Sequence, residues 1–258
     1  MSRIKEAFNN KKAFIPFITC GDPDIDTTKA LVKEIVKNGA DLVELGIPFS
    51  DPTAEGPTIQ GANIRALSGG VNKDKIFAMV KSLRDEDGIS IPLVFMTYAN
   101  VVFSYGSDRF FKTCQEIGID GVILPDLPYE EKGEFEEISD KYGVDLISLI
   151  APTSANRIAM IAKEAKGFIY IVSSLGVTGT RTSITTDVAS IVEVVKANTD
   201  VPCAIGFGIS NPEQAAKMAS SADGVIVGSA IVKIIEKYGK DSVTPVGEFV
   251  KSMVDAIR

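Results

Sequence analysis

Residues 38–48 of the chain read NGADLVELGIP, and this stretch decides the fold. A turn containing aspartate leads into a short apolar strand, which ends in a polar or glycine-rich exit. The same form recurs as IGIDGVILPDLP at 117–128 and as SSADGVIVGSA at 220–230. The likeness fits either an internal repeat or the turns that any barrel of alternating strands and helices favours. Both interpretations predict buried strands whose exits carry the functional groups.

Eight segments of this kind are predicted to be β-strands. Most are continuously apolar, as parallel strands covered on both faces are, and each gap between them can hold a helix. The sequence therefore predicts an α/β fold: a single (β/α)₈ TIM barrel, one domain over residues 1–258, with extra N-terminal and loop helices. The expected strands are 14–19, 41–45, 93–98, 121–124, 146–150, 168–172, 203–206 and 224–227, and the main expected helices are 27–38, 107–117, 129–142, 156–165, 187–197, 212–219 and 231–238.

The amino-acid composition excludes several kinds of catalysis and several classes of partner. The 258 residues include 27 Lys plus Arg and 34 Asp plus Glu, a net charge of −7, and no histidine. The absence of a basic block argues against a nucleic-acid or anionic membrane partner. Without histidine there is no Ser-His-Asp or Cys-His catalysis and no His-ligated metal, so no metal is expected. Acid–base chemistry near neutral pH is then expected to depend mainly on carboxylates.

Cysteine usage and the absence of long apolar runs indicate a cellular compartment. Cys20, Cys114 and Cys203 are an odd number without a CxxC motif, which is typical of reduced thiols. The N-terminal residues are too polar for a signal peptide, and no apolar run approaches the roughly 18 residues of a membrane span. The chain is predicted to be a cytoplasmic protein.

Glycine-rich exits follow the seventh and eighth strands. GFGIS at 206–210 and GSAI at 228–231 let backbone N–H groups approach a ligand, and a helix start adds partial positive charge. This pair of exits is where barrels often bind phosphate, although tight turns alone would have the same composition. After strand 6, SSLGVTGTRTS at 173–183 is typical of a mobile lid, with Thr178 and Gly179 as further phosphate ligands, or of a plain surface loop. Tyr170 is either a core residue or part of the barrel mouth.

Carboxylates mark the second strand and the loop after it. Glu44 interrupts an apolar strand and alternates with Val43 and Leu45, which places it inside the barrel, where burial would raise its pKa. A structural ion pair is the alternative. Asp51 and Glu55 follow on a proline-rich loop from which either could reach back over the mouth, although loop carboxylates are usually just solvated.

The segment ELGIPFSDPTAEGPTIQ at 44–60 resembles the signature of the tryptophan synthase α subunit family. SSLGVTG, GFGIS and VGSAI follow in the order of that family after strands 6, 7 and 8. The resemblance covers essentially the whole chain. It implies retro-aldol cleavage of indole-3-glycerol phosphate to indole and glyceraldehyde 3-phosphate without a cofactor, and a β-subunit partner in an α₂β₂ assembly.

The resemblance also assigns residues to roles. Glu44 is the general acid/base, and Glu55 takes the place of a second carboxylate that in the family is commonly Asp. We expect the loop backbone to be set back to accommodate the longer side chain. The indole pocket is expected to include Phe17 and Tyr170, the partner interface Pro48, Asp51 and the 174–186 loop, and the phosphate site Thr178, Gly179, Gly206, Phe207, Gly208, Gly228 and Ser229.

Two other functions are compatible with these residues. One is another phosphate-binding barrel isomerase or epimerase, although an epimerase would be expected to use metal ligands that include histidine. The other is a barrel with weakened catalysis that serves as a binding or activating subunit. The only feature that favours this second function is Glu55 in place of Asp. Asp126, in the strand 4 exit PDLP, is expected to have no catalytic role.

Overall fold

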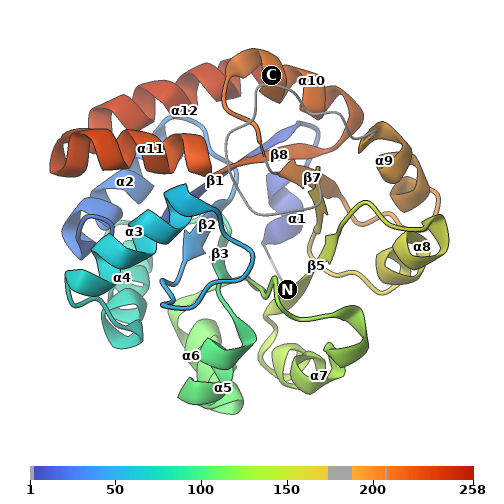
Figure 1. Ribbon diagram of the computed structural model, residues 1–258, viewed down its shortest axis with the longest axis horizontal. Coiled ribbons are helices and arrows are strands. Elements are labelled where there is room, and N and C mark those ends of the chain that lie inside the picture. Colours follow the sequence, from blue (N-terminus) through green and yellow to red (C-terminus); the bar gives the residue numbers. More distant parts are fainter. Residues whose placement is uncertain (1–2, 174–187, 207) are drawn as a thin grey trace.

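A closed barrel of eight parallel strands forms the centre of the molecule (Figure 1). The computed structural model describes residues 3–173, 188–206 and 208–258. Each strand pairs with its sequence neighbours, and β1 closes the ring on β8. The strands are β1 (Ala13–Thr19), β2 (Val43–Gly46), β3 (Leu93–Met96), β4 (Gly121–Ile123), β5 (Asp145–Ile150), β6 (Ile169–Val172), β7 (Cys203–Gly206) and β8 (Gly224–Val227).

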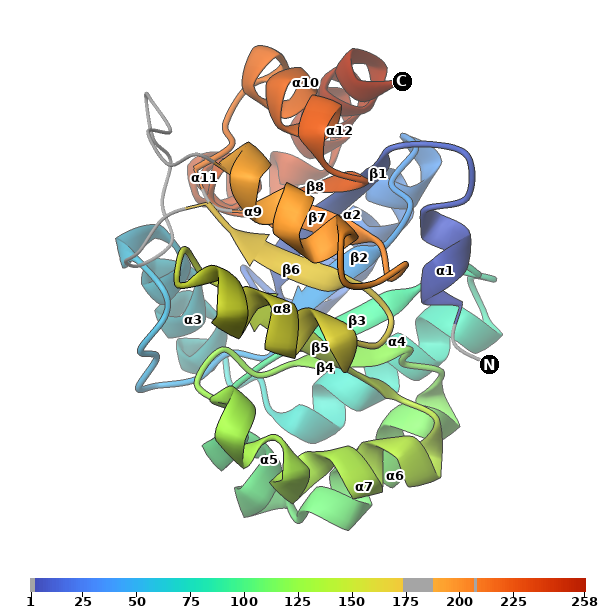
Figure 2. The same cartoon turned by 90° about the vertical axis from the view of Figure 1, so that its right-hand side faces the viewer.

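Helices surround the barrel, as the two perpendicular views show (Figures 1 and 2). Their amphipathic sequences bury one face against the strands, and several begin at a side-chain cap such as Asp24, which accepts from the Thr27 N–H. The α-helices are α1 (Ile4–Ala7), α2 (Ile25–Lys37), α3 (Pro57–Ser68), α4 (Lys73–Asp85), α5 (Ala99–Tyr105), α6 (Ser107–Ile117), α7 (Gly133–Tyr142), α8 (Ala155–Lys163), α9 (Val188–Lys196), α10 (Pro212–Ser221), α11 (Ser229–Tyr238) and α12 (Val243–Ile257), and the 3₁₀ turns are η1 (Tyr129–Glu131) and η2 (Gly239–Ser242).

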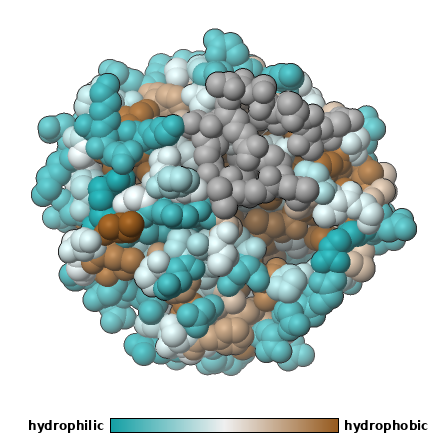
Figure 3. Space-filling model, viewed as in Figure 1, coloured by the Kyte–Doolittle hydropathy of each residue, from teal (hydrophilic) through white to brown (hydrophobic). Residues whose placement is uncertain are grey.

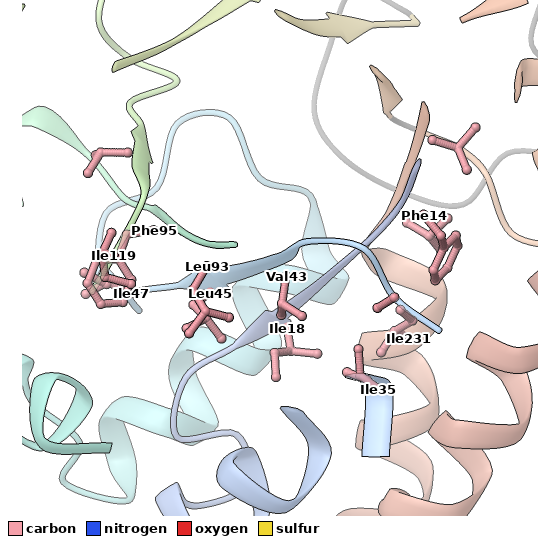
Figure 4. Packing of buried hydrophobic residues seen from close by; sticks show 14 of the residues in the cluster. Phe14, Ile18, Ile35, Val43, Leu45, Ile47, Leu93, Phe95, Ile119 and Ile231 are labelled. Carbon is pink, nitrogen blue, oxygen red and sulfur yellow. The ribbon is translucent and has the colours of Figure 1, made fainter. Parts of the chain in front are cut away.

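Apolar side chains form two buried clusters. One lies between the strands and the helices, and Figure 4 shows members of it, among them Ile18, Val43 and Leu45. The other fills the barrel itself. Its strand residues include Ala13, Ile15, Phe17, Val94, Met96, Ile123, Ile147, Phe168, Tyr170, Val172, Ala204 and Ile226. Alternate residues of a strand face opposite sides, so each strand except β2 contributes to both clusters; the inward residue of β2 is Glu44.

The structure confirms the predicted barrel and all eight strands, with ends shifted by up to two residues. The predicted helix 129–142 is divided into η1 and α7, and the helix expected at 231–238 begins at Ser229. The long connection after β2 contains two helices, α3 and α4. In the described part of the chain, no helix is long and apolar enough to cross a membrane.

Candidate active site

Glu44 lies on β2 with its side chain inside the barrel. Its neighbours in register are Phe17 on β1 and Val94 on β3. The residue is 1% exposed, and among the residues that the structure describes neither carboxylate oxygen has a hydrogen-bond partner. Burial raises the pKa of Glu44 to about 8, because the charged form loses its hydration. The structural ion pair that the sequence left open is therefore absent within the described residues.

Glu55 lies at the end of the loop that follows β2, two residues before α3 begins at Pro57. It is 7% exposed and so is not a solvated loop carboxylate. Asn63 Nδ2 donates to Glu55 Oε2 at 2.7 Å, and the nearby Tyr98 hydroxyl also favours the ionised form of this carboxyl group. Burial raises the pKa of Glu55 to about 7, and the Asn63 hydrogen bond and the Tyr98 hydroxyl oppose that rise.

Both carboxyl groups line one pocket at the barrel mouth. Its empty space, including the open mouth, is about 480 Å³. Figure 3 shows apolar residues in a hollow near the centre of this face, with mostly hydrophilic residues around it. Five of the other predicted site residues also lie in the lining. The complete lining is Phe17, Glu44, Glu55, Ile59, Met96, Tyr170, Gly208, Ile209, Ile226, Gly228 and Ser229.

Two glycines make room for the aromatic rings of the pocket. A Cβ at Gly46 would lie 2.6 Å from the end of the Phe17 ring. A Cβ at Gly206 would lie 2.3 Å from the Tyr170 hydroxyl oxygen. Gly206 is thus explained by its contact with Tyr170, and it does not itself line the pocket.

The start of α11 forms the opposite wall of the pocket. Gly228 precedes the helix and Ser229 is its first residue. The first N–H groups of a helix lack intrahelical acceptors and carry partial positive charge, which suits a phosphate. Gly208 has φ +83°, a conformation that glycine adopts at little cost. Its backbone lines the same pocket as Gly228 and Ser229. These are the described parts of the predicted phosphate site.

Several predicted residues lie elsewhere. Thr178, Gly179, Phe207 and the 174–186 loop fall outside the described residues. Of the two residues predicted at a partner interface, Asp51 is exposed and Pro48 is buried.

Sequence patterns alone do not predict a role in the site for Asn63, Tyr98 or the apolar wall residues Ile59 and Met96. Asn63 could have been noticed as a polar residue on the apolar face of α3, among Ile59, Ala62 and Ala66. Tyr98 stands at a strand exit, where barrel sites are built. Asp126 accepts from the Ala99 N–H at 3.0 Å, at the start of α5, and it does not line the pocket.

Within the part of the chain that the structure describes, the side chains do not form an evident metal centre. Residues 3–173, 188–206 and 208–258 contain no group of three or more His, Cys, Asp or Glu side chains that could hold a metal ion. The polar groups of the pocket are two carboxyls, a tyrosine hydroxyl, a serine and backbone N–H groups. Such an arrangement can move protons and bind an anion.

A closed (β/α)₈ barrel with a pair of buried carboxyl groups and a helix start at the carboxyl ends of its strands defines the class: a barrel enzyme of the acid–base type. The family model described as "Tryptophan synthase alpha chain" matches residues 3–257. The chain belongs to this family. The family reaction is the lyase cleavage of indole-3-glycerol phosphate to indole and glyceraldehyde 3-phosphate in tryptophan biosynthesis.

Individual relatives agree with the family model. A tryptophan synthase alpha chain from Lacticaseibacillus casei is 48% identical over 257 residues, which span 100% of this chain and 96% of the relative. The crystal structure of tryptophan synthase subunit alpha from Legionella pneumophila has a TM-score of 0.90 at 41% identity, over 100% of this chain and 98% of the other. A chain of the tryptophan synthase complex from Pyrococcus furiosus has a TM-score of 0.87 at 34% identity, over 95% and 99%.

Proposed function

We propose that Glu44 and Glu55 together carry out the proton transfers by which this chain cleaves indole-3-glycerol phosphate. The observation that supports this most directly is that two buried carboxyl groups with raised pKa values, about 8 and about 7, face one pocket. Titratable groups whose environments separate their pKa values are typical of an acid and a base acting together. At neutral pH Glu44 is mostly protonated, and Glu55 is the group that ionises first.

The reaction then proceeds by proton transfers alone. Glu44 gives its proton to indole C3, and the positive charge that develops on the ring is stabilised by the Glu55 carboxylate, which takes the N1 proton. The Glu44 carboxylate then removes the proton of the C3′ hydroxyl. The C3–C3′ bond breaks, its electrons return to the indole ring, N1 takes its proton back from Glu55, and the hydroxyl carbon becomes the aldehyde of glyceraldehyde 3-phosphate. Each proton transfer needs one of these carboxyl groups within hydrogen-bond reach.

The two ends of the substrate are bound by different walls of the pocket. The indole ring lies with Phe17 and Tyr170, whose burial supports an apolar subsite. The phosphate lies at the start of α11 and the neighbouring glycine loops, where backbone N–H groups bind it without a basic side chain. This explains how a chain of net charge −7 binds an anion. The proposed phosphate residues are Thr178, Gly179, Gly206, Phe207, Gly208, Gly228 and Ser229.

We further propose that the chain works with a β subunit in an α₂β₂ assembly in the cytoplasm, and that residues 1–258 act as one domain. The Pyrococcus furiosus relative, which was solved as a tryptophan synthase complex, supports the partner. The three cysteines, which are free and buried, are compatible with a reducing compartment. The proposed contact face contains Pro48, Asp51 and the 174–186 loop.

Indole release from indole-3-glycerol phosphate tests the catalytic roles. We expect Glu44→Gln and Glu55→Gln each to lower kcat by at least about 10²-fold, because each removes one proton transfer. We expect kcat/KM of the wild type to rise with pH through an acid limb near pH 7, as Glu55 ionises. As a matched control, Glu213→Gln changes an exposed carboxylate of α10 and should leave the rate unchanged. Near-normal turnover by Glu44→Gln would remove Glu44 from the mechanism.

A further inference from the structure

Two separate elements hold the Glu55 side chain in place. A glutamate side chain has three rotatable bonds, so a carboxyl group at the end of a loop samples many positions unless other groups hold it. Helix α3 donates a hydrogen bond to the Glu55 carboxyl group, and Tyr98, in the segment between β3 and α5, lies near it. The pocket itself is lined mainly by apolar side chains, which cannot orient a carboxylate.

Helix α3 holds both the backbone and the carboxyl group of Glu55. Gln60 Nε2 donates to the Glu55 carbonyl oxygen at 2.7 Å, and Asn63 Nδ2 donates to Glu55 Oε2 at 2.7 Å. Asn63 is 4% exposed, and the other buried residues of α3 are apolar. A buried amide on an apolar face is costly unless it is hydrogen-bonded, and the Glu55 carboxylate is its partner here.

Tyr98 contacts the same loop at two points. The Ala54 N–H donates to the Tyr98 hydroxyl oxygen at 3.1 Å, so the hydroxyl proton is not used in this bond, and the hydroxyl favours the ionised form of the neighbouring Glu55. The Tyr98 ring is 2% exposed and packs against Phe49, with the ring centroids 5.3 Å apart. The hydroxyl is thereby held at a defined position.

We propose that Asn63, assisted by Tyr98, is a positioning residue that aims the Glu55 carboxylate at the indole N1 proton and favours its ionised form. This inference rests on the proposed role of Glu55. Asn63 donates a hydrogen bond to the carboxylate, and the Tyr98 hydroxyl acts on its pKa in the same direction; such donors stabilise the charged state of a carboxyl group. The other titratable groups that line the pocket are Glu44 on β2 and Tyr170 on β6, and neither supplies a positive charge. Among the described residues, Asn63 and Tyr98 are therefore the groups that stabilise the ionised Glu55 carboxylate.

The pH dependence of catalysis tests this role. Asn63→Leu keeps a similar volume and removes the donor, so the pKa of Glu55 should rise and the acid limb of kcat/KM should move to higher pH by about one unit. We expect kcat at pH 7 to fall on the order of 10-fold, with KM changed much less. Asn63→Asp places a second carboxyl group beside Glu55 and should move the limb further in the same direction. Ile64→Ala, at an exposed position of the same helix, is the matched control and should leave the profile unchanged.

Tyr98→Phe provides a second test that does not alter α3. It retains the ring packing against Phe49 and should also move the acid limb to higher pH. The pKa of Glu55 can be measured without substrate by NMR of the labelled carboxyl carbon, in the wild type and in Asn63→Leu. If Asn63→Leu lowers the melting temperature while the acid limb and the Glu55 titration stay in place, the residue is only structural and the inference fails.

A double substitution separates this inference from the proposed function. In a Glu55→Gln background, Asn63→Leu should have little further effect on kcat, because the carboxylate that it positions is gone. An equal loss in both backgrounds would contradict the positioning role while leaving the catalytic role of Glu55 intact. If Glu55→Gln is itself fully active, the proposed function fails, whatever the Glu55 titration shows.

Discussion

At the residue scale, the burial that raises the pKa of Glu44 also lowers the stability of the folded chain at high pH. A carboxyl group inside a packed barrel loses its hydration, and in the described part of the chain no donor replaces it. Its pKa is therefore raised from the ordinary value of 4.5 to about 8. In the unfolded chain the same group ionises at its ordinary pKa. Between these two values the unfolded state binds fewer protons, so folding becomes less favourable as pH rises.

Replacement of Glu44 should therefore stabilise the protein while it inactivates the enzyme. We expect Glu44→Gln to raise the free energy of unfolding at pH 9 by several kcal/mol more than at pH 4, because the penalty grows between the unfolded pKa and about pH 8 and is complete above it. Urea unfolding at both pH values measures this. A gain that is equal at the two pH values would contradict the assigned cause. Glu213→Gln, at an exposed position, should show no such dependence.

At the scale of elements, α3 connects the catalytic loop to the rest of the barrel mouth. Its first turns hold Glu55, and Arg65, further along the helix, binds the connection between β1 and α2. Arg65 Nε and Nη2 donate to the two Asp22 oxygens at 2.8 and 2.9 Å, and Nη1 reaches Glu236 on α11 at 3.1 Å. Asp22 is 1% exposed, so the arginine is what makes its burial tolerable.

Loss of this ion pair should destabilise the fold measurably. We expect Arg65→Met to lower the free energy of unfolding by about 1–3 kcal/mol, because the Asp22 carboxylate would remain buried without its partner. Urea unfolding at neutral pH measures the effect. Lys81→Ala removes an exposed pair with Asp85 and should cost at most about 0.5 kcal/mol. Equal losses in the two variants would show that Arg65 acts only as a surface charge.

At the scale of the whole molecule, the pocket and the stabilising ion pairs lie at opposite ends of the barrel axis. The pocket lies at the carboxyl ends of the strands, whereas the opposite face is joined by ion pairs such as Arg84 with Asp120 and Arg258 with Asp41. Asp51 is exposed on the loop after β2, and the same loop ends at Glu55. A partner bound to this loop would therefore act close to Glu55, the proposed catalytic carboxylate.

We expect Asp51→Ala to weaken activation by a β subunit without slowing the isolated chain. The exposed side chain contacts Ser50 and is not part of the pocket, so its loss should leave the intrinsic rate unchanged. Indole release measured with increasing amounts of β subunit should require more partner for the same acceleration. Asp255→Ala, on α12, is a control far from that loop in sequence. Unchanged activation in Asp51→Ala would place the contact elsewhere.

Local sequence patterns were sufficient to predict the barrel and part of its site. Most of the strands are continuous apolar segments, and this pattern is expected of any parallel strand that is covered on both faces. Glu44 was identifiable because a carboxylate interrupts such a segment, and Gly208, Gly228 and Ser229 because they follow strands 7 and 8. Where the prediction failed, as at the break between η1 and α7, the boundary depends on turn geometry more than on periodicity.

The sequence by itself determined the fold class, the absence of histidine chemistry and the small set of carboxylates from which a mechanism can be built. Only the tertiary structure decided which groups hold Glu55, because Asn63 lies 8 residues away and Tyr98 contacts the loop across 44 residues. It also decided the pKa values near 7 and 8. Periodicity is a local property of the chain, whereas burial and hydrogen bonding arise from contacts between distant segments, and these set the protonation of a carboxyl group.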